Sequence, residues 1–538
     1  MKEKTMKEKM LKGSAWMTAG SIISRILGAI YIIPWYSWFG DDRLQANALY
    51  TKGYTVYSVF LMIAISGIPS AVAKQVARYN SQNEYRISDR LFKLSFGVLF
   101  VVGIVATAVF WFLAPYISQG DKALVSIYRS LAVALLVIPT MSLLRGYFQG
   151  FQDMAPSAMS QLIEQFLRII YMLAATYITI KVLDLPYEAG VFQSTFAAFI
   201  GAVGGMLLLV FYYLRKRKHL KELVQNSANK LKISDKKLLT DVFYQAIPFI
   251  LIACALATFN LIDQFSFPVI MQNVTNASQA QINALYALFA GNANKLIMIV
   301  VAVATAMATT AIPLLSEAIA KKDSELMKEQ LLNSLELLLF VSLPAVFGMV
   351  AVSRPLYTVF YGYDQTGVYV LAVSAYIALM MCLYNVLGAL LQGIYENKRA
   401  IKYTLIGLVV KCVLQYPLTA LLGVFGPLLA TGIGMAWASY LMLNFLYVKY
   451  DLQTNELQRS FNKLFIISLV MFGVALLGVS GYYYIFSSNG RLVAVFGLVI
   501  FALLGGLIYV ALCLKSGLFE KILGKKLATR VRKILRWG

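Results

Sequence analysis

The chain has 538 residues, of which 59% are hydrophobic and only 14% are charged, and its formal net charge is +23. Soluble globular domains carry about 25% charged residues, so this composition argues against a soluble enzyme or binding module. Apolar runs of about 20 residues recur along the whole length, and each is long enough to cross the hydrocarbon core of a bilayer. We therefore predict an all-α polytopic membrane protein, because a membrane β-barrel would show alternating segments of about ten residues instead.

The apolar runs define fourteen predicted spans. Their bounds are 13–36, 53–76, 91–117, 124–148, 156–182, 189–214, 240–270, 282–313, 327–352, 369–393, 401–422, 427–448, 461–486 and 491–515. The connecting loops alternate between basic and nearly neutral, and the loop 215–237 is the most basic. The positive-inside rule then predicts that both termini are cytoplasmic, which requires an even number of spans. Because the positive charges gather at span ends, they indicate anionic membrane lipids as a partner rather than nucleic acid.

The two halves of the chain resemble each other. Gln149-Gly150 within LLRGYFQGFQDMAPSA aligns with Gln392-Gly393 within LGALLQGIYENKRAIK at an offset of 243 residues, and Pro69 aligns with Pro313 at an offset of 244. We therefore predict two homologous six-helix lobes, residues 1–214 and 240–450, in the same orientation. A basic cytoplasmic linker, 215–239, joins them, and the last two spans, within 451–515, lie outside the repeat.

The segment 516–538 is predicted to be an amphipathic basic helix on the cytoplasmic membrane surface. Lysines and arginines fill one part of its helical surface, and apolar residues share the other face: Phe519, Ile522, Leu523, Leu527, Val531, Ile534 and Leu535. A solvated basic tail is the alternative.

Two basic residues lie near mid-depth of predicted spans that hold no acid to pair with them, Arg25 in the first span and Lys295 in the eighth. An arginine at the bilayer centre costs at least about 2.5–3.5 kcal/mol, so such residues should face a cavity and a ligand. A cationic cavity suits an anion, and a guanidinium is well shaped for phosphate. Lys52, at the outer edge of the second span, is a further candidate.

Other charges within the spans have possible protein partners. Glu164 and Arg168 are four residues apart in the fifth span, and an ion pair between them is the favoured interpretation. Asp263 in the seventh span and Lys411 in the eleventh could neutralise each other or take part in ion coupling. Arg145, close to a cytoplasmic span end, is expected to snorkel to the interface.

Several chemistries have no counterpart in the sequence. There is no Gly-x-x-x-x-Gly-Lys-Ser/Thr loop, so direct drive by ATP is not expected. There is no metal-ligand cluster, and no pair of carboxylates suited to a lipid-sugar transferase. We therefore expect no catalytic residues, no bound metal and no cofactor.

Three stretches resemble a known family: SRILGAIYIIPW in the first span, SGIPSAVAKQVARYN ending the second, and RGYFQGFQDMAPSAMSQLIEQFLRI across the fourth and fifth. They are similar to the polysaccharide-exporter branch of the MOP (MATE-like) superfamily. Within it, they most resemble the MurJ-type lipid II flippases of Gram-positive bacteria and the related stage V sporulation protein B. The resemblance covers essentially the whole chain, including the extra final pair of spans.

The resemblance implies a function. Such flippases use alternating access to move an undecaprenyl-pyrophosphate-linked saccharide from the inner to the outer leaflet of the bacterial cytoplasmic membrane. Cations of the first, second and eighth helices hold the pyrophosphate, a role that falls on Arg25 and Lys295 here. The last two helices form a groove for the lipid tail, and cell-wall synthesis proteins are possible partners.

The chain departs from the family pattern in two places. A second arginine of the first helix in Gram-negative relatives is Tyr31 here, so Lys52 is a candidate for the missing cation. Some relatives bind sodium between helices seven, eleven and twelve; Asp263 fits such a site, but Lys411 stands where an acid is expected. We hypothesise that the Lys411 ammonium occupies the place of the ion, which points to membrane potential or protons as the driving force.

Three other functions remain open from the sequence. The chain could be a flippase for another lipid-linked polysaccharide, such as a teichoic-acid or capsule precursor. A MATE-like exporter of cationic drugs is less favoured, because Arg25 and Lys295 would repel a cation. A scaffold of an envelope-assembly complex would give no reason for an unpaired arginine in a span.

Overall fold

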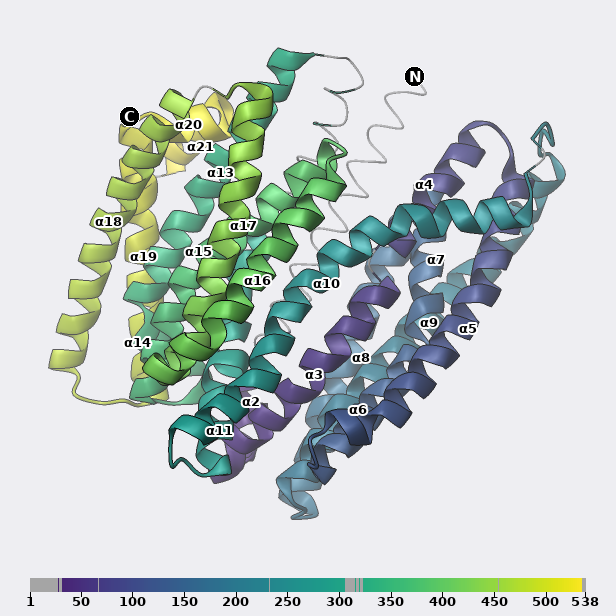
Figure 1. Cartoon of the computed structure of the whole chain (residues 1–538). Helices are drawn as coiled ribbons and strands as arrows, with labels where there is room; N and C mark the ends of the chain where they lie inside the picture. Colours follow the sequence, from purple (N-terminus) through teal and green to yellow (C-terminus); the bar gives the residue numbers. More distant parts are fainter. Residues whose placement is uncertain are drawn as a thin grey trace. The chain divides into compact units, whose positions relative to one another are not determined.

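The computed structural model describes residues 28, 31–65, 67–231, 233–304, 315, 319, 323–452 and 454–534. These residues form helices joined by short turns, and none of them lies in a β-strand (Figure 1). The helices group into two compact units, which cover residues 1–261 and 262–538. The all-α prediction is confirmed.

The first unit is a bundle of long helices. Within it α8 packs on α9, α4 on α7, and both α5 and α9 pack on α6. The elements are α2 (Ile32–Trp38), η1 (Gly40–Asp42), α3 (Arg43–Ile65), α4 (Ile68–Ser81), α5 (Tyr85–Ile117), α6 (Lys122–Leu135), α7 (Ile138–Gly150), α8 (Ala155–Tyr177), the π-helical turn η2 (Ile178–Val182), α9 (Tyr187–Gln225) and the start of α10 (Asp235–Val274).

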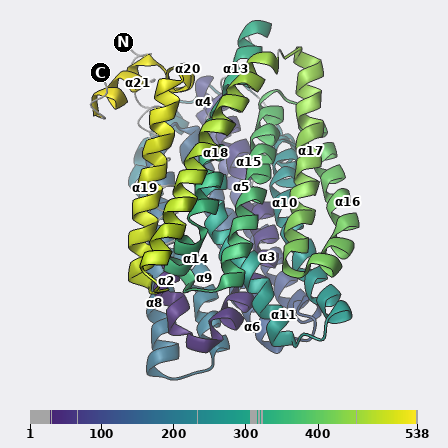
Figure 2. The same ribbon diagram turned by 90° about the vertical axis from the view of Figure 1, so that its left-hand side faces the viewer.

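The second unit begins within α10. Its helices α13, α15, α18 and α19 run side by side, and α16 packs along α17 (Figure 2). The elements are α11 (Gln279–Tyr286), the π-helical turn η3 (Ala287–Ala293), α13 (Ser324–Ala351), α14 (Ser353–Tyr361), α15 (Gln365–Gly393), α16 (Asn397–Leu422), η4 (Gly423–Phe425), α17 (Gly426–Tyr450), α18 (Thr454–Ile485), α19 (Arg491–Lys515), α20 (Leu518–Leu523) and α21 (Lys525–Ile534).

The described helices include many that can cross a membrane. By length and composition, 11 stretches qualify, and one of them, Asn397–Tyr450, contains both α16 and α17. Most of the first predicted span lies outside the described residues. The chain is a multi-pass membrane protein, and these stretches are consistent with fourteen spans, a number that stays a prediction.

Two predicted spans are interrupted. The second breaks between α3 and α4, where Gly67 has a φ of 80° and Pro69 lies in the first turn of α4. Only glycine adopts this φ without steric cost, and proline is tolerated at a helix start but not in its interior. The fourth breaks between α6 and α7 without a positive φ, and Pro139 again lies in the first turn of the following helix. Hydropathy alone does not detect such breaks, because the flanking residues are mostly apolar.

The basic linker 215–239 is only partly a loop. Helix α9 continues through it to Gln225, and α10 already begins at Asp235. The described residues between these helices cross to the start of α5, where Glu84 accepts hydrogen bonds from the backbone N–H groups of Lys230 and Leu231. A membrane-spanning helix can continue into water with polar residues, so the end of the apolar run does not mark the end of the helix.

The internal repeat recurs as the same turn in both units. After α7 and after α15 the chain turns through a non-glycine residue of positive φ, Gln152 at 60° and Tyr395 at 61°. These positions are 243 residues apart, which is the offset found in the sequence. The next residue in each turn, Asp153 or Glu396, pairs with a lysine of α9 or α17 respectively. Because positive φ is uncommon outside glycine, the halves repeat local structure as well as sequence.

The C-terminal segment differs from the single surface helix that was predicted. It forms two short helices, α20 and α21, because Gly524 between them has a φ of 87°. Phe519 is only 5% exposed and lies 5.9 Å from Phe340 of α13, ring centre to ring centre. Lys521 pairs with the buried Glu336 of α13 at 2.6 Å. The apolar face of α20 therefore packs on the protein's own helices, while most lysines and arginines of α21 stay exposed.

Candidate functional site

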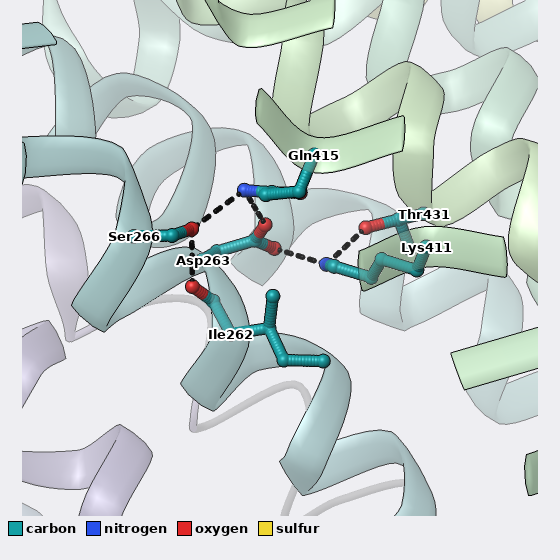
Figure 3. A network of polar contacts seen from close by, with 6 residues as sticks. All are labelled: Ile262, Asp263, Ser266, Lys411, Gln415 and Thr431. Atoms are coloured by element: carbon teal, nitrogen blue, oxygen red, sulfur yellow. Dashed lines mark hydrogen bonds and ion pairs between the residues drawn. The ribbon is translucent and has the colours of Figure 1, made fainter. Parts of the chain in front are cut away.

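A polar network lies inside the second unit, where α10, α16 and α17 meet (Figure 3). Helix α10 contributes Asp263 and Ser266, α16 contributes Lys411 and Gln415, and α17 contributes Thr431. The two residues of α10 are three apart and those of α16 are four apart, so each pair projects from one helix face. Five polar side chains thus converge within otherwise apolar helices.

The network centres on an ion pair. Lys411 Nζ donates to Asp263 Oδ2 at 2.8 Å and to Thr431 Oγ1 at 2.6 Å. Gln415 Nε2 donates to Asp263 Oδ1 and to Ser266 Oγ, both at 3.0 Å. Both carboxylate oxygens therefore accept a hydrogen bond, one from a cation and one from a neutral amide (Figure 3).

The ion pair is deeply buried. The Lys411 side chain is 0% exposed and that of Asp263 is 10% exposed. Taking two charges out of water is unfavourable unless their attraction and further hydrogen bonds offset the cost, and this network supplies those bonds. Chemically, the ammonium occupies a position between a carboxylate and a hydroxyl, which are the oxygen ligands that a hard cation would use. The observed pair thus neutralises Asp263 from within the protein.

A second charged cluster lies inside the first unit. Arg145 of α7 pairs with Glu164 of α8 at 2.7 Å, and its Nε and Nη2 donate to Ser160 Oγ at 3.1 and 2.7 Å. Glu164 therefore does not form the predicted ion pair with Arg168, because Arg145 reaches it from the neighbouring helix. Arg145 likewise does not snorkel to the interface as predicted. An i,i+4 spacing makes a pair possible, but packing of α7 on α8 selects another partner.

Arg168 instead turns to an aromatic residue. Its Nη2 donates to Tyr54 Oη of α3 at 2.5 Å, and its Cζ lies 5.0 Å from the centre of the Tyr54 ring. This geometry combines a hydrogen bond with a cation–π contact. The contact leaves Arg168 a cation whose partner is neutral.

Two of the three predicted pyrophosphate ligands, Lys52 and Lys295, lie among the described residues. Arg25 lies outside the described residues. Lys52 is buried in α3 at 9% exposure, and the Asp121 carboxylate that caps α6 acts on it electrostatically. Lys295 is partly exposed and lies two residues after the end of η3. Because π-helical turns occur often at functional sites, its position agrees with a functional role.

The first comparison is with known sequences. A family model described as "Polysaccharide biosynthesis protein" matches residues 10–319, and one described as "MatE" matches residues 284–417. The lipid II flippase MurJ of Bacillus subtilis is 34% identical to the chain, over 98% of this chain and 99% of that protein. The chain belongs to the MurJ-type branch of the polysaccharide biosynthesis family. Stage V sporulation protein B of Bacillus subtilis is 25% identical, over 81% of this MurJ-type chain and 83% of that protein.

Solved structures agree on the fold. A multidrug resistance MATE family transporter of the MOP superfamily, in an inward-facing conformation, matches with a TM-score of 0.65 at 16% identity, over 79% of this chain and 94% of that one. Lipid II flippase MurJ in an inward closed conformation matches with a TM-score of 0.64 at 15% identity, over 95% and 99%. These identities are low, so the likeness establishes the fold alone. The predicted MATE/MOP-like fold is confirmed. The assignment to transport proteins rather than enzymes is confirmed by the 34% identity to the lipid II flippase of Bacillus subtilis.

Sequence reasoning missed the uncharged members of both clusters. Gln415 and Thr431 in the second unit, and Ser160 and Tyr54 in the first, carry no charge that would stand out in an apolar span. Spacing gave a signal for Gln415, four residues after Lys411, for Ser160, four residues before Glu164, and for Ser266, three residues after Asp263, because each shares a helix face with a charged residue. Thr431 and Tyr54 come from other helices, 20 residues from Lys411 and 114 residues from Arg168, so only packing could identify them.

Proposed function

We propose that this chain is a flippase that moves lipid II, an undecaprenyl-pyrophosphate-linked saccharide, from the inner to the outer leaflet of the bacterial cytoplasmic membrane. The observation that carries the proposal is the 34% identity to a lipid II flippase, which extends over nearly the whole of both chains. The matching fold supports transport through the membrane by helices alone. Alternating access without ATP is the mechanism that we assign to it.

The substrate site consists of Arg25, Lys295 and Lys52 in this proposal. Pyrophosphate carries several negative charges, and lysine and arginine side chains within membrane-spanning helices compensate them. The lobes 1–214 and 240–450 would alternate in exposing these cations to the two leaflets, with the segment 215–239 joining them. The same cations disfavour a MATE-like exporter of cationic drugs.

An apolar groove of about 300 Å³ in the second unit supports a site for the lipid tail. Helices α13, α15, α17 and α18 line it, with seven apolar residues and one amide: Leu335, Leu338, Leu339, Leu383, Leu443, Leu457, Phe461 and Gln458. A polyisoprenyl chain is apolar along its length and would bury against such leucines. The proposed tail site includes α18, which belongs to the final two spans. Its other lining helices, α13, α15 and α17, belong to the second half of the repeat.

The ion pair of Lys411 with Asp263 supports coupling that does not use sodium. The ammonium already provides the positive charge that an alkali cation would bring to this carboxylate. Membrane potential or protons then remain as the driving force. We further propose that both termini are cytoplasmic, and that anionic lipids and cell-wall synthesis proteins are partners of the basic cytoplasmic surface.

Depletion of the protein in growing cells tests the function. Lipid II should accumulate in the inner leaflet, because its translocation is the step that is lost, and labelling of lipid-linked precursors by leaflet measures this. A wild-type copy should restore the distribution. An Arg25→Ala copy should insert and fold but not restore it, and Arg25→Lys should restore it only in part, because an ammonium lacks the bidentate geometry of a guanidinium.

Two results would contradict the proposal. Accumulation of a teichoic-acid or capsule precursor, with lipid II unchanged, would redirect the substrate to another lipid-linked saccharide. Full restoration by Arg25→Ala would reject Arg25 as an anion ligand.

A further inference from the structure

Arg168 is a cation inside the first unit that meets an aromatic cluster rather than an acid. Tyr54, which accepts its hydrogen bond, contacts Tyr50 in a tilted and Tyr57 in an edge-to-face arrangement, at ring-centre distances of 4.5 and 5.6 Å. No Asp or Glu among the residues that the structure describes forms an ion pair with Arg168. Tyrosine rings attract a guanidinium, but they do not neutralise it.

The charges around Arg168 do not balance. Glu164, one helical turn earlier, is the nearest acid on α8, and Arg145 of α7 pairs with it. These two arginines and one glutamate together carry a net charge of +1. A membrane interior disfavours such an excess unless an anion compensates it.

The internal repeat places a second basic residue, Lys411, at the position in the second unit that is equivalent to Arg168. At the offset of 243 residues, Arg168 corresponds to Lys411, which Asp263 of α10 neutralises. Helix α10 contains the first span of the second half, and its counterpart is the first span of the chain. That span has no acid at all between Glu8 and Asp41. The first half therefore has a cation at this position, Arg168, but its first span has no acid that corresponds to Asp263.

The helix that carries Arg168 also borders the first span, which carries Arg25 in the sequence. Gly28 of that span lies beside α8, since a Cβ placed on it would be 3.5 Å from Gln165 Nε2. Arg168 itself is partly exposed. Its guanidinium has five N–H donors in a planar fork, and Tyr54 accepts from one of its nitrogens. The remaining donors match the oxygens of a phosphate group.

We propose that Arg168 is a substrate-binding residue of the transport site and donates to a phosphate oxygen of the pyrophosphate group. The inference rests on the proposed function, because it assigns a further ligand to the same substrate. Tyr54 holds the guanidinium in place before the substrate arrives. When the substrate binds, the phosphate oxygen replaces part of the contact between Arg168 and Tyr54.

Binding to the purified full-length protein tests the inference, with three probes: undecaprenyl pyrophosphate, undecaprenol and phosphatidylglycerol. Arg168→Ala should weaken binding of undecaprenyl pyrophosphate by about 10- to 100-fold, the range for hydrogen bonds to a charged group, and leave undecaprenol unchanged. Arg168→Lys should recover part of the loss. Arg129→Ala is the matched control, because Arg129 of α6 also lies over an aromatic ring, that of Trp111 at 5.2 Å, and should change nothing.

The outcomes separate the inference from the proposed function. If the wild type binds undecaprenyl pyrophosphate no better than undecaprenol, the proposed function fails. If the wild type discriminates between them and Arg168→Ala does so equally, only the inference is overturned. An equal loss for phosphatidylglycerol would assign Arg168 to phospholipid headgroups and also overturn it. Tyr54→Phe removes the hydroxyl that holds the guanidinium but keeps the guanidinium itself, so it should weaken binding less than Arg168→Ala; an equal loss in both variants would overturn the role of Arg168 as the phosphate donor.

Discussion

At the scale of single residues, the chain uses two different solutions for charges inside membrane-spanning helices. Lys411 is neutralised by Asp263 at 2.8 Å, whereas Arg168 is held by the neutral Tyr54. A neutralised pair has little affinity for a further ion, while an uncompensated cation attracts an anion. Arg168 and Lys411 thus occupy equivalent positions of the repeat but differ in role. Lys411 is structural, and Arg168, as we propose, binds the ligand.

Lys411→Ala tests the first role. The substitution leaves the Asp263 carboxylate buried without its cation, and breaking one side of a buried pair costs about 3–5 kcal/mol. We expect a clearly lower thermal unfolding midpoint for the purified variant. Sodium should raise that midpoint in the variant but not in the wild type, because the carboxylate and Thr431 hydroxyl can then bind the ion.

The control for this variant is Lys402→Ala, on the same helix at an exposed position, which should leave the midpoint unchanged. Transport by the wild type that stops when sodium is replaced by a larger organic cation would refute the assignment of Lys411 to the place of the ion. Sodium dependence that is the same in the wild type and Lys411→Ala would refute it as well.

At the scale of helices, close packing positions the network. A Cβ added to Gly407 of α16 would lie 2.5 Å from the carbonyl oxygen of Gly434 in α17, so the two backbones are in direct contact. Small residues allow such approach between helices in membranes. Gly407 is one turn before Lys411, and the close approach brings the Lys411 ammonium within 2.6 Å of Thr431 on α17.

Gly407→Ala should therefore push α16 away from α17. Overpacking of this kind costs about 1–3 kcal/mol, and the Lys411–Thr431 hydrogen bond should lengthen with it. Thermal unfolding of the purified variant measures the loss. Gly388→Ala in α15 is the matched control, since its added Cβ meets no atom within 4 Å and should be neutral or slightly stabilising. Equal midpoints for both variants would reject the packing argument.

At the scale of the whole molecule, topology follows from charge and repeat together. Alternating basic loops predict an even number of spans, and a six-helix repeat returns each half to the same orientation. The repeated turns at Gln152 and Tyr395 agree with this arrangement. The loop after α9 should therefore be cytoplasmic, and the loop between α18 and α19 should be extracellular.

Single cysteines test this topology in a variant whose four native cysteines are replaced by alanine. Asn226→Cys, after α9, and Ser487→Cys, between α18 and α19, are both at exposed positions. A membrane-impermeant maleimide should label Ser487→Cys in intact cells and Asn226→Cys only after permeabilisation. Labelling of both in intact cells, or of Asn226→Cys alone, would contradict the predicted orientation.

The sequence by itself determined the membrane class, the approximate spans, the repeat and the family, because hydropathy, loop charge and aligned motifs are all legible in local stretches of residues. It also identified Asp263 and Lys411 as potential partners, since each is a charged residue deep within an otherwise apolar span. Only the tertiary structure decided that Glu164 pairs with Arg145, 19 residues away, and that Arg168 meets Tyr54, 114 residues away. The same holds for the C-terminal segment, whose apolar face would suit lipid or protein equally well. In each case the local pattern allows several partners, and the packing of distant helices selects one.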